Sequence, residues 1–261
     1  MPTGLPLAVD HRPGPGPLVV ALHAGVADRR CWTDALPSGA ATLTYDRRGF
    51  GASPPSPDGE FTHLADLLAL LADLATGPAW LVGNSMGGGL ALDAAVTAPD
   101  LVAGLVLLAP AVSGAPDPVE DDPRTLDLDA RADAAAEAGD LETAVELDAQ
   151  LWLDGPTSPA GRVGGAAREL FRAMDATVHR NRAFAAGNGD GDAWSRLGDL
   201  DLPVVLATGD LDCGYLQHRT EELLARIPGA RRADLPGVAH LPSLERPDLV
   251  RAVVEDAVRT A

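Results

Sequence analysis

The chain has 261 residues, of which 46% are hydrophobic and 22% are charged. That balance is typical of one large globular domain with an insertion and excludes a disordered chain. The formal net charge of −18 comes from 38 acidic and 20 basic residues. A field of this sign repels phosphodiesters and anionic lipids, so we expect neither a nucleic-acid nor a membrane partner.

Cysteine usage and the first residues indicate the compartment. Cys31 and Cys213 are the two cysteines. They are too few for a disulfide framework and lack the spacing of zinc ligands. The chain starts without a basic segment followed by an apolar run, and no apolar run approaches about 18 residues. These features predict a cytoplasmic protein with no metal site and no membrane span.

Short apolar runs alternate with segments of helical period, which predicts a mostly parallel sheet with helices on both faces. An antiparallel hairpin is expected first, with residues 5–10 turning through the Pro- and Gly-rich residues 13–17 into the next strand. The predicted strands then follow at residues 18–22, 41–44, 79–82, 104–108, 204–208 and 231–235. Helices are predicted at residues 62–75, 86–98, 216–226 and 244–258.

The alternation stops between residues 115 and 200. This stretch is rich in Ala, Asp and Gly, and it has helical period at residues 130–150 and 165–184. We interpret it as a helical lid inserted into a core that residues 1–114 and 201–261 form. The glycines and aspartates at 187–192 predict a flexible loop at its edge.

The most specific motif is Gly83-Asn84-Ser85-Met86-Gly87, a G-x-S-x-G pattern between a predicted strand and a predicted helix. A sharp turn there projects the serine and requires small residues two positions away on either side. The helix N-terminus adds free N–H groups that favour developing negative charge. A phosphate-binding loop is a poorer interpretation, because no Gly-Lys-Ser/Thr follows.

A serine nucleophile needs a histidine base that a carboxylate orients. Asp210 and Asp212 follow the strand predicted at 204–208, and His240 follows the last predicted strand. The strand and helix on either side of His240 favour a catalytic role over that of a surface histidine. Packing or solvated roles are expected for the remaining candidates His11, His63, His179 and His218.

The ordered motifs together resemble those of the α/β-hydrolase superfamily, in particular 3-oxoadipate enol-lactonase-like hydrolases and esterases. The matching segments are LHAG at 22–25, YDRRGFGAS at 45–53, GNSMGG at 83–88, GDLD at 209–212 and GVAHLPSLERP at 237–247. The resemblance implies an α/β-hydrolase fold with an eight-stranded, mostly parallel sheet and an inserted helical lid. It also implies a reaction without a cofactor.

The resemblance assigns roles to single residues. It selects Asp212 over Asp210 as the acid. Asp210 would then cap the helix that follows. Backbone N–H groups of Met86 and Gly25 would form the oxyanion hole. Ala24 stands where the family usually has glycine, so Val26 is the alternative second donor. His23 is expected to stabilise its loop.

The substrate pocket has a smaller set of candidates. Val26, Trp32 and Trp152 would line it, although packing between the lid and the core would explain both tryptophans equally well. Arg47 and Arg48 are typical of turn or ion-pair residues, and a carboxylate-binding arginine is the alternative.

The predicted activity is hydrolysis of a small-molecule ester or lactone by a Ser85–His240–Asp212 triad. One alternative is hydrolysis of a carbon–carbon bond in a dienoic ketoacid. Another is a non-catalytic ligand receptor on the same fold. The sequence leaves the physiological substrate and the oligomeric state open.

Overall fold

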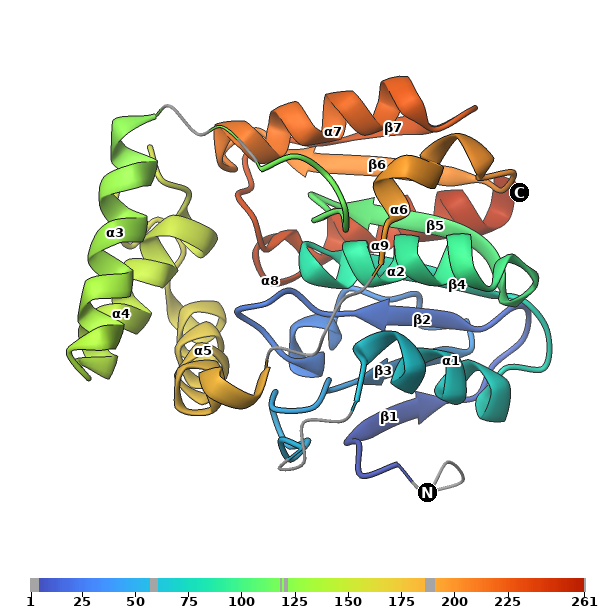
Figure 1. The fold of residues 1–261 in the computed structure, drawn as a ribbon, viewed down its shortest axis with the longest axis horizontal. Helices are drawn as coiled ribbons and strands as arrows, with labels where there is room; N and C mark the ends of the chain where they lie inside the picture. The colour runs from blue at the N-terminus through green and yellow to red at the C-terminus, as the bar shows by residue number, and fades with distance from the viewer. Residues whose placement is uncertain (1–4, 57–60, 118, 120–121, 186–190, 261) are drawn as a thin grey trace.

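The computed structural model describes residues 5–56, 61–117, 119, 122–185 and 191–260. One sheet of seven strands runs through this part of the chain in the order β1-β3-β2-β4-β5-β6-β7 (Figure 1). Every neighbouring pair is parallel except β1 with β3. The strands are β1 Val9–Arg12, β2 Val19–Leu22, β3 Thr42–Tyr45, β4 Ala79–Asn84, β5 Val102–Leu108, β6 Val204–Gly209 and β7 Arg231–Leu235.

Two strand predictions were wrong. The described residues contain seven strands and not eight. The first strand does not form a hairpin with the second, because β1 pairs with β3, with Val9 opposite Tyr45. A tight hairpin turn needs backbone N–H donors that prolines lack, and residues 13–17 alternate proline with glycine. The connection therefore carries the chain past the position of β3 and into β2.

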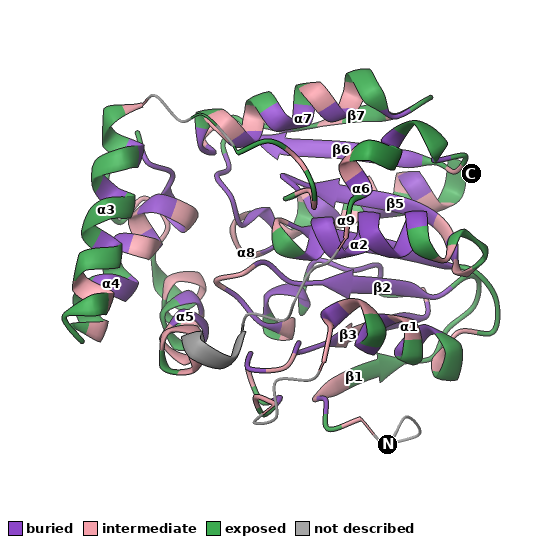
Figure 2. Ribbon diagram, viewed as in Figure 1, coloured by how far each residue is buried: buried purple, intermediate pink, exposed green. Residues whose placement is uncertain are grey.

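Alternate residues of the central strands face two separate cores, as the period of a strand requires. On one face, Val20, Leu81 and Leu107 pack with leucines of α1 and α2. On the other face, Val19 and Val82 pack with valines of α9 and with part of the segment between β5 and β6. Burial on both faces explains why the central strands are almost wholly apolar (Figure 2).

The crossover helices largely match their predicted positions. They are α1 His63–Leu74, α2 Met86–Thr97 and α7 Gly214–Arg226. The Thr62 side chain caps α1 by accepting from the Ala65 N–H at 3.0 Å. The final helix was predicted as one element but is two, α8 Pro242–Glu245 and α9 Pro247–Thr260. Proline disfavours helical backbone in the residue before it, so Arg246 separates them.

The segment between β5 and β6 contains the helices that project beyond the end of the sheet (Figure 1). We call residues 122–185 the helical insertion. It comprises α3 Pro123–Glu137, α4 Leu141–Asp148, the π-helix η3 Ala149–Asp154 and α5 Gly165–Ala185. The single helix predicted at 130–150 is broken at Gly139, whose φ of +76° ends α3. Asp140 then caps α4.

The end of this connection returns to the core. Ala193 of α6 Ala193–Arg196 and Leu197 of the 3₁₀ turn η4 Leu197–Asp199 pack in the same core cluster as α2. Residues 187–190 of the predicted flexible loop lie outside the described residues. No helix in the described ranges is long and apolar enough to cross a membrane.

Candidate active site

Ser85 lies at the turn between β4 and α2, in a backbone conformation that is rare for a residue with a side chain. Its φ is 54° and its ψ is −119°. This strain persists because the turn is bonded on several sides. The Ser85 N–H donates to Leu108 O at 2.9 Å, and the Ser85 carbonyl accepts from Gly89 and Ala111 at 3.0 Å. The half-buried side chain stands at the carboxyl end of a central strand.

The two glycines of the motif are required by close backbone contacts. A Cβ on Gly83 would lie 2.4 Å from Gly87 O, and a Cβ on Gly87 would lie 2.1 Å from Leu22 O. Real Cβ atoms do not approach backbone oxygens this closely. Glycine at these positions therefore lets α2 start directly against β2 and β4.

Backbone donors surround the serine. Met86 is the first residue of α2, and N–H groups in a first helical turn have no partner within the helix. Gly25 and Val26 follow β2 and are half-buried. A Cβ on Gly25 would lie 2.7 Å from Met86 Sδ, so this loop packs against the residue after Ser85. Donors in such positions suit an oxygen that gains negative charge.

His23 braces this loop, as predicted. It is fully buried, and its Nδ1 lies 2.8 Å from Ala24 O. Its Nε2 accepts from the Arg47 backbone N–H at 3.1 Å. The Arg47 guanidinium also donates to the carbonyls of His23 and Ala24. Burial lowers the pKa of His23 well below its ordinary value, which keeps the ring neutral.

The two arginines of the turn after β3 differ in their partners. Arg48 forms two hydrogen bonds with Asp66, at 2.7 and 2.9 Å. Arg47 lies 4.5 Å above the Phe50 ring and is 2% exposed. Burial lowers the pKa of Arg47 to about 10. Both residues therefore hold the turn, as expected.

Asp212 and His240 form a buried pair. Asp212 Oδ2 lies 3.0 Å from His240 Nδ1, and Asp212 Oδ1 accepts from the Cys213 N–H at 2.8 Å. The two side chains are 0% and 3% exposed. With Nδ1 bound to the carboxylate, Nε2 is the nitrogen left to exchange a proton with a substrate or a hydroxyl.

Asp210 has a different environment from Asp212. It is exposed, and its Oδ1 accepts from the Gly237 N–H at 2.6 Å. Asp210 therefore ties the loop after β6 to the loop after β7. In the described contacts Asp210 forms no hydrogen bond with His240. It also does not cap α7, which was its expected role.

The sheet topology places Ser85 at the same end of the sheet as this pair. The strands that precede Ser85, Asp212 and His240 all end at the same edge of the sheet. Among the described residues, no hydrogen bond joins the Ser85 hydroxyl to His240. Such bonds are commonly long in a free enzyme and shorten when substrate binds.

The three pocket candidates lie in different environments. Trp32 is 1% exposed and packs in a core cluster with α9, which favours the packing alternative over a place in the pocket. Val26 is half-buried beside the candidate oxyanion loop. Trp152 lies in η3, and its ring centroid is 4.9 Å from that of His240.

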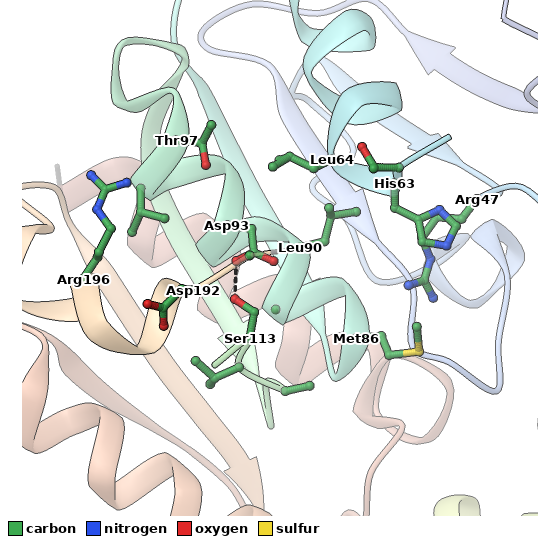
Figure 3. Close-up of a pocket in the computed structure, with 16 residues that line it drawn as sticks. Arg47, His63, Leu64, Met86, Leu90, Asp93, Thr97, Ser113, Asp192 and Arg196 are labelled. Atoms are coloured by element: carbon green, nitrogen blue, oxygen red, sulfur yellow. Dashed lines mark hydrogen bonds between the residues drawn. The ribbon is translucent and has the colours of Figure 1, made fainter. Parts of the chain in front are cut away.

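A cavity of about 590 Å³ runs along the outer face of α2 (Figure 3). Met86 lies at one end, beside Arg47 and His63, and Asp93 lies further along the helix. Asp93 contacts Ser113 and has its pKa raised by burial. Met86, which follows Ser85 in the chain, lines this cavity, whereas Ser85, Asp212 and His240 are not among the described residues that line it.

A second group of titratable side chains lies within the helical insertion. His179 Nε2 is 2.8 Å from Asp148 and 3.4 Å from Asp175. The hydrogen bonds to these carboxylates raise the pKa of His179 to about 9. The three groups have the donor types of a metal site, but the ion pairs account for their arrangement. From the sequence, only a packing or solvated role was expected for His179.

Sequence reasoning also missed Gly155, Arg162 and Glu245, which surround the His240 loop. Glu245 lies within the GVAHLPSLERP segment, so the motif contained a signal for it. Arg162 lies in the insertion, where the pattern gives no sign of its partners.

Comparisons with known proteins identify the family of this chain. The sequence profile described as the alpha/beta hydrolase family matches residues 19–253. The pimeloyl-acyl-carrier-protein methyl ester esterase of Chromobacterium violaceum is 31% identical over 261 residues, covering 93% of this chain and 94% of the relative.

Solved structures give the same result. An esterase from Thermogutta terrifontis, with malate bound, has a TM-score of 0.75 and is 25% identical to this chain. The match covers 97% of this chain and 93% of the esterase chain. The enol-lactonase from Burkholderia xenovorans LB400 has a TM-score of 0.74 and is 20% identical. The match covers 97% of this chain and 96% of the enol-lactonase chain. At that identity the likeness to the enol-lactonase shows the fold alone.

Proposed function

Because this chain belongs to the alpha/beta hydrolase family, we propose that it is a serine hydrolase that cleaves a carboxylic ester or a lactone. The observation that carries the proposal is the buried Asp212–His240 hydrogen bond of 3.0 Å. It lies at the sheet edge where Ser85 is held in a strained turn. The esterase relative of Chromobacterium violaceum supports ester cleavage over other reactions of this fold.

The first step is attack on the carbonyl carbon. Ser85 Oγ forms a bond to that carbon while His240 Nε2 takes the hydroxyl proton, and Asp212 holds the imidazole through Nδ1. The carbonyl oxygen gains the negative charge. The N–H groups of Met86 and Gly25 stabilise it, and one such donor is worth about 3 to 4 kcal/mol.

The second half regenerates the serine. His240 returns the proton to the leaving oxygen, which departs and leaves an acyl group on Ser85. Water then attacks the acyl carbonyl while His240 takes a proton from it. His240 passes this proton to Ser85 Oγ as the bond from Oγ to the acyl carbon breaks, and the acid is released. These steps use side chains of this chain and water. We place one substituent of the substrate in the cavity that Met86 lines.

Two rival functions make different predictions. Hydrolysis of a carbon–carbon bond would use the same triad, but relatives with that reaction tend to have a longer glycine run after the first histidine than His23-Ala24-Gly25. A ligand receptor would have no need of the buried Asp212–His240 pair. Cys31 and Cys213 are both buried and form no disulfide in the part of the chain that the structure describes, which supports a reducing cytoplasmic location.

The test uses a fluorophosphonate probe and the variant Ser85→Ala. We expect the probe to label Ser85, and the variant to lose about 10⁴- to 10⁶-fold in kcat on p-nitrophenyl acetate. A parallel screen of esters, lactones and vinylogous ketoacids, with Ser85→Ala as the control, distinguishes the reaction classes. A folded protein that the probe does not label would favour the receptor.

A further inference from the structure

A short part of the helical insertion lies against both loops of the candidate triad. The Trp152 carbonyl accepts from the His240 backbone N–H at 3.2 Å. Gly155 has a φ of +90°, and a Cβ there would lie 2.4 Å from Leu211 O and 3.3 Å from Ala239 Cβ. The insertion therefore contacts the residue before the acid and the residue before the histidine.

Arg162 joins these two regions directly. On the insertion side, its Nε donates to Asp154 O at 2.6 Å and its Nη2 donates to Leu153 O at 2.9 Å. On the other side, its Nη1 donates to Gly237 O at 3.2 Å, and its Nη2 forms an ion pair with Glu245. One guanidinium thus connects η3 to the start of the His240 loop and to α8.

Glu245 links Arg162 to the residue that precedes His240. Its carboxylate accepts from the Ala239 N–H at 2.9 and 3.1 Å, and Ala239 directly precedes His240. The Glu245 side chain is 2% exposed. Burial raises the pKa of Glu245, and the Arg162 guanidinium opposes that rise. Removing Arg162 would leave a buried carboxylate without its cation, which is costly.

The insertion side of this connection is itself firmly anchored. Leu153, Phe171 and Met174 are fully buried and belong to the same core cluster as the strands and α9. Asp154 is also fully buried, and it accepts from the Gly161 and Val163 N–H groups at 2.7 and 2.8 Å. The residues that Arg162 holds are therefore part of the core packing.

From these contacts we propose that Arg162 is a positioning residue for His240, which it aligns through Glu245 and the Ala239 backbone. The inference rests on the proposed function, because it matters only if His240 moves protons. In this arrangement residues 149–163 form a fixed wall of the active site. Any opening of the insertion to admit substrate would have to occur elsewhere, for example at α3 and α4.

The test compares two arginines of the same insertion. Arg162→Met removes the connection to the His240 loop. Arg168→Met is the matched control, because it also removes the cation of a buried carboxylate, Asp154, but breaks no bond to the His240 loop: the other described partners of Arg168 are Glu146 and Val163. We expect Arg162→Met to lower kcat on p-nitrophenyl acetate about 10- to 100-fold with KM within about threefold. Arg168→Met should change kcat by less than about threefold.

Coupling to Glu245 separates positioning from general stabilisation. The double variant Arg162→Met/Glu245→Gln should lose no more in kcat than Arg162→Met alone, because both changes break one connection. Arg162→Lys should restore part of the loss. If Arg162→Met fails to fold, Arg162→Lys and Glu245→Gln test the same coupling. Equal kcat losses in Arg162→Met and Arg168→Met, or an effect on KM alone, would overturn the proposal.

A second readout does not depend on turnover. Hydrogen exchange of the peptide spanning residues 236–243 should accelerate in Arg162→Met and stay unchanged in Arg168→Met. Unchanged exchange in Arg162→Met would contradict the alignment of the histidine loop. Full activity of Ser85→Ala, in contrast, would contradict the proposed function. The hydrogen-exchange result would then still show whether Arg162 holds the His240 loop in place.

Discussion

The turn at Ser85 and the contact between the helical insertion and His240 fix the proposed nucleophile and the proposed base in different ways. At Ser85 the backbone itself decides the geometry, because glycines at 83 and 87 allow contacts that any side chain would prevent. At His240 the geometry depends on long side chains from distant segments, above all Arg162 and Glu245. We therefore expect the turn at Ser85 to tolerate almost no change in the residues around it, whereas the side chains that support His240 can be replaced individually.

The largest expected effect concerns the acid that orients His240. Asp212→Asn should lower kcat on p-nitrophenyl acetate about 10⁴-fold, because the amide favours the wrong imidazole tautomer. Asp210→Asn should change kcat less than about tenfold, since Asp210 only ties two loops together. Steady-state kinetics of both purified variants check this. A larger loss from Asp210→Asn would reverse the assignment of the acid.

Next in size is a change within the Ser85 turn. Gly87→Ala would place a Cβ 2.1 Å from Leu22 O. We expect it to lower the free energy of unfolding by more than about 4 kcal/mol, or to prevent folding. Gly164→Ala is the control, because a Cβ there meets nothing within 4 Å; its effect should stay within about 1 kcal/mol. Urea denaturation measures both, and a stable, active Gly87→Ala would contradict the steric argument.

A change in the insertion tests whether it unfolds with the core. Phe171 is fully buried among core residues of the sheet. Phe171→Ala should cost about 3 to 5 kcal/mol and shift one cooperative transition. Leu126→Ala, at a residue that is 49% exposed, should cost less than about 0.5 kcal/mol. Two separate transitions in calorimetry would show that the insertion is an independent unit.

The smallest expected effect is a pH dependence in the insertion. Asp148 and Asp175 raise the pKa of His179 to about 9 from 6.5. A raised pKa in the folded protein gives stability that is fully present below pH 6.5 and is lost as pH rises through 9. His179→Gln should remove about 1 to 2 kcal/mol at pH 6, after allowance for solvent screening, and much less at pH 10.

The chain contains no lysine, so few other groups titrate in that pH range. Urea denaturation at pH 6, 8 and 10 measures the difference between the wild type and His179→Gln. A difference that stays constant with pH would show that His179 contributes only by packing.

The sequence allowed the central strands and the Ser85 turn to be predicted, because both depend on local patterns, whereas the choice of Asp212 over Asp210 came from the family resemblance. Apolar runs give buried parallel strands, and small residues around Ser85 give the turn. The pairing of β1 with β3 was missed, since strand partners depend on the path of the connection. The break at Gly139 was missed because alanines on both sides of it favour one continuous helix.

Long-range polar contacts account for most of what was missed in the site. Arg162 is 83 residues from Glu245 in the chain, and nothing in the residues around it indicates that partner. The cavity along α2 likewise depends on how five separate segments meet, among the residues that the structure describes. Such features become visible only when the fold brings the segments together.

The two outermost strands of the sheet have a consequence for how copies of this chain meet each other. An open sheet presents unpaired backbone groups at its margins, and these can recruit a strand from another molecule. Here the margins are Val9–Arg12 and Arg231–Leu235, and each is short and carries charged side chains in exposed positions. Extending the sheet from one molecule to the next would bring these charges together, which disfavours fibrous aggregation at high concentration.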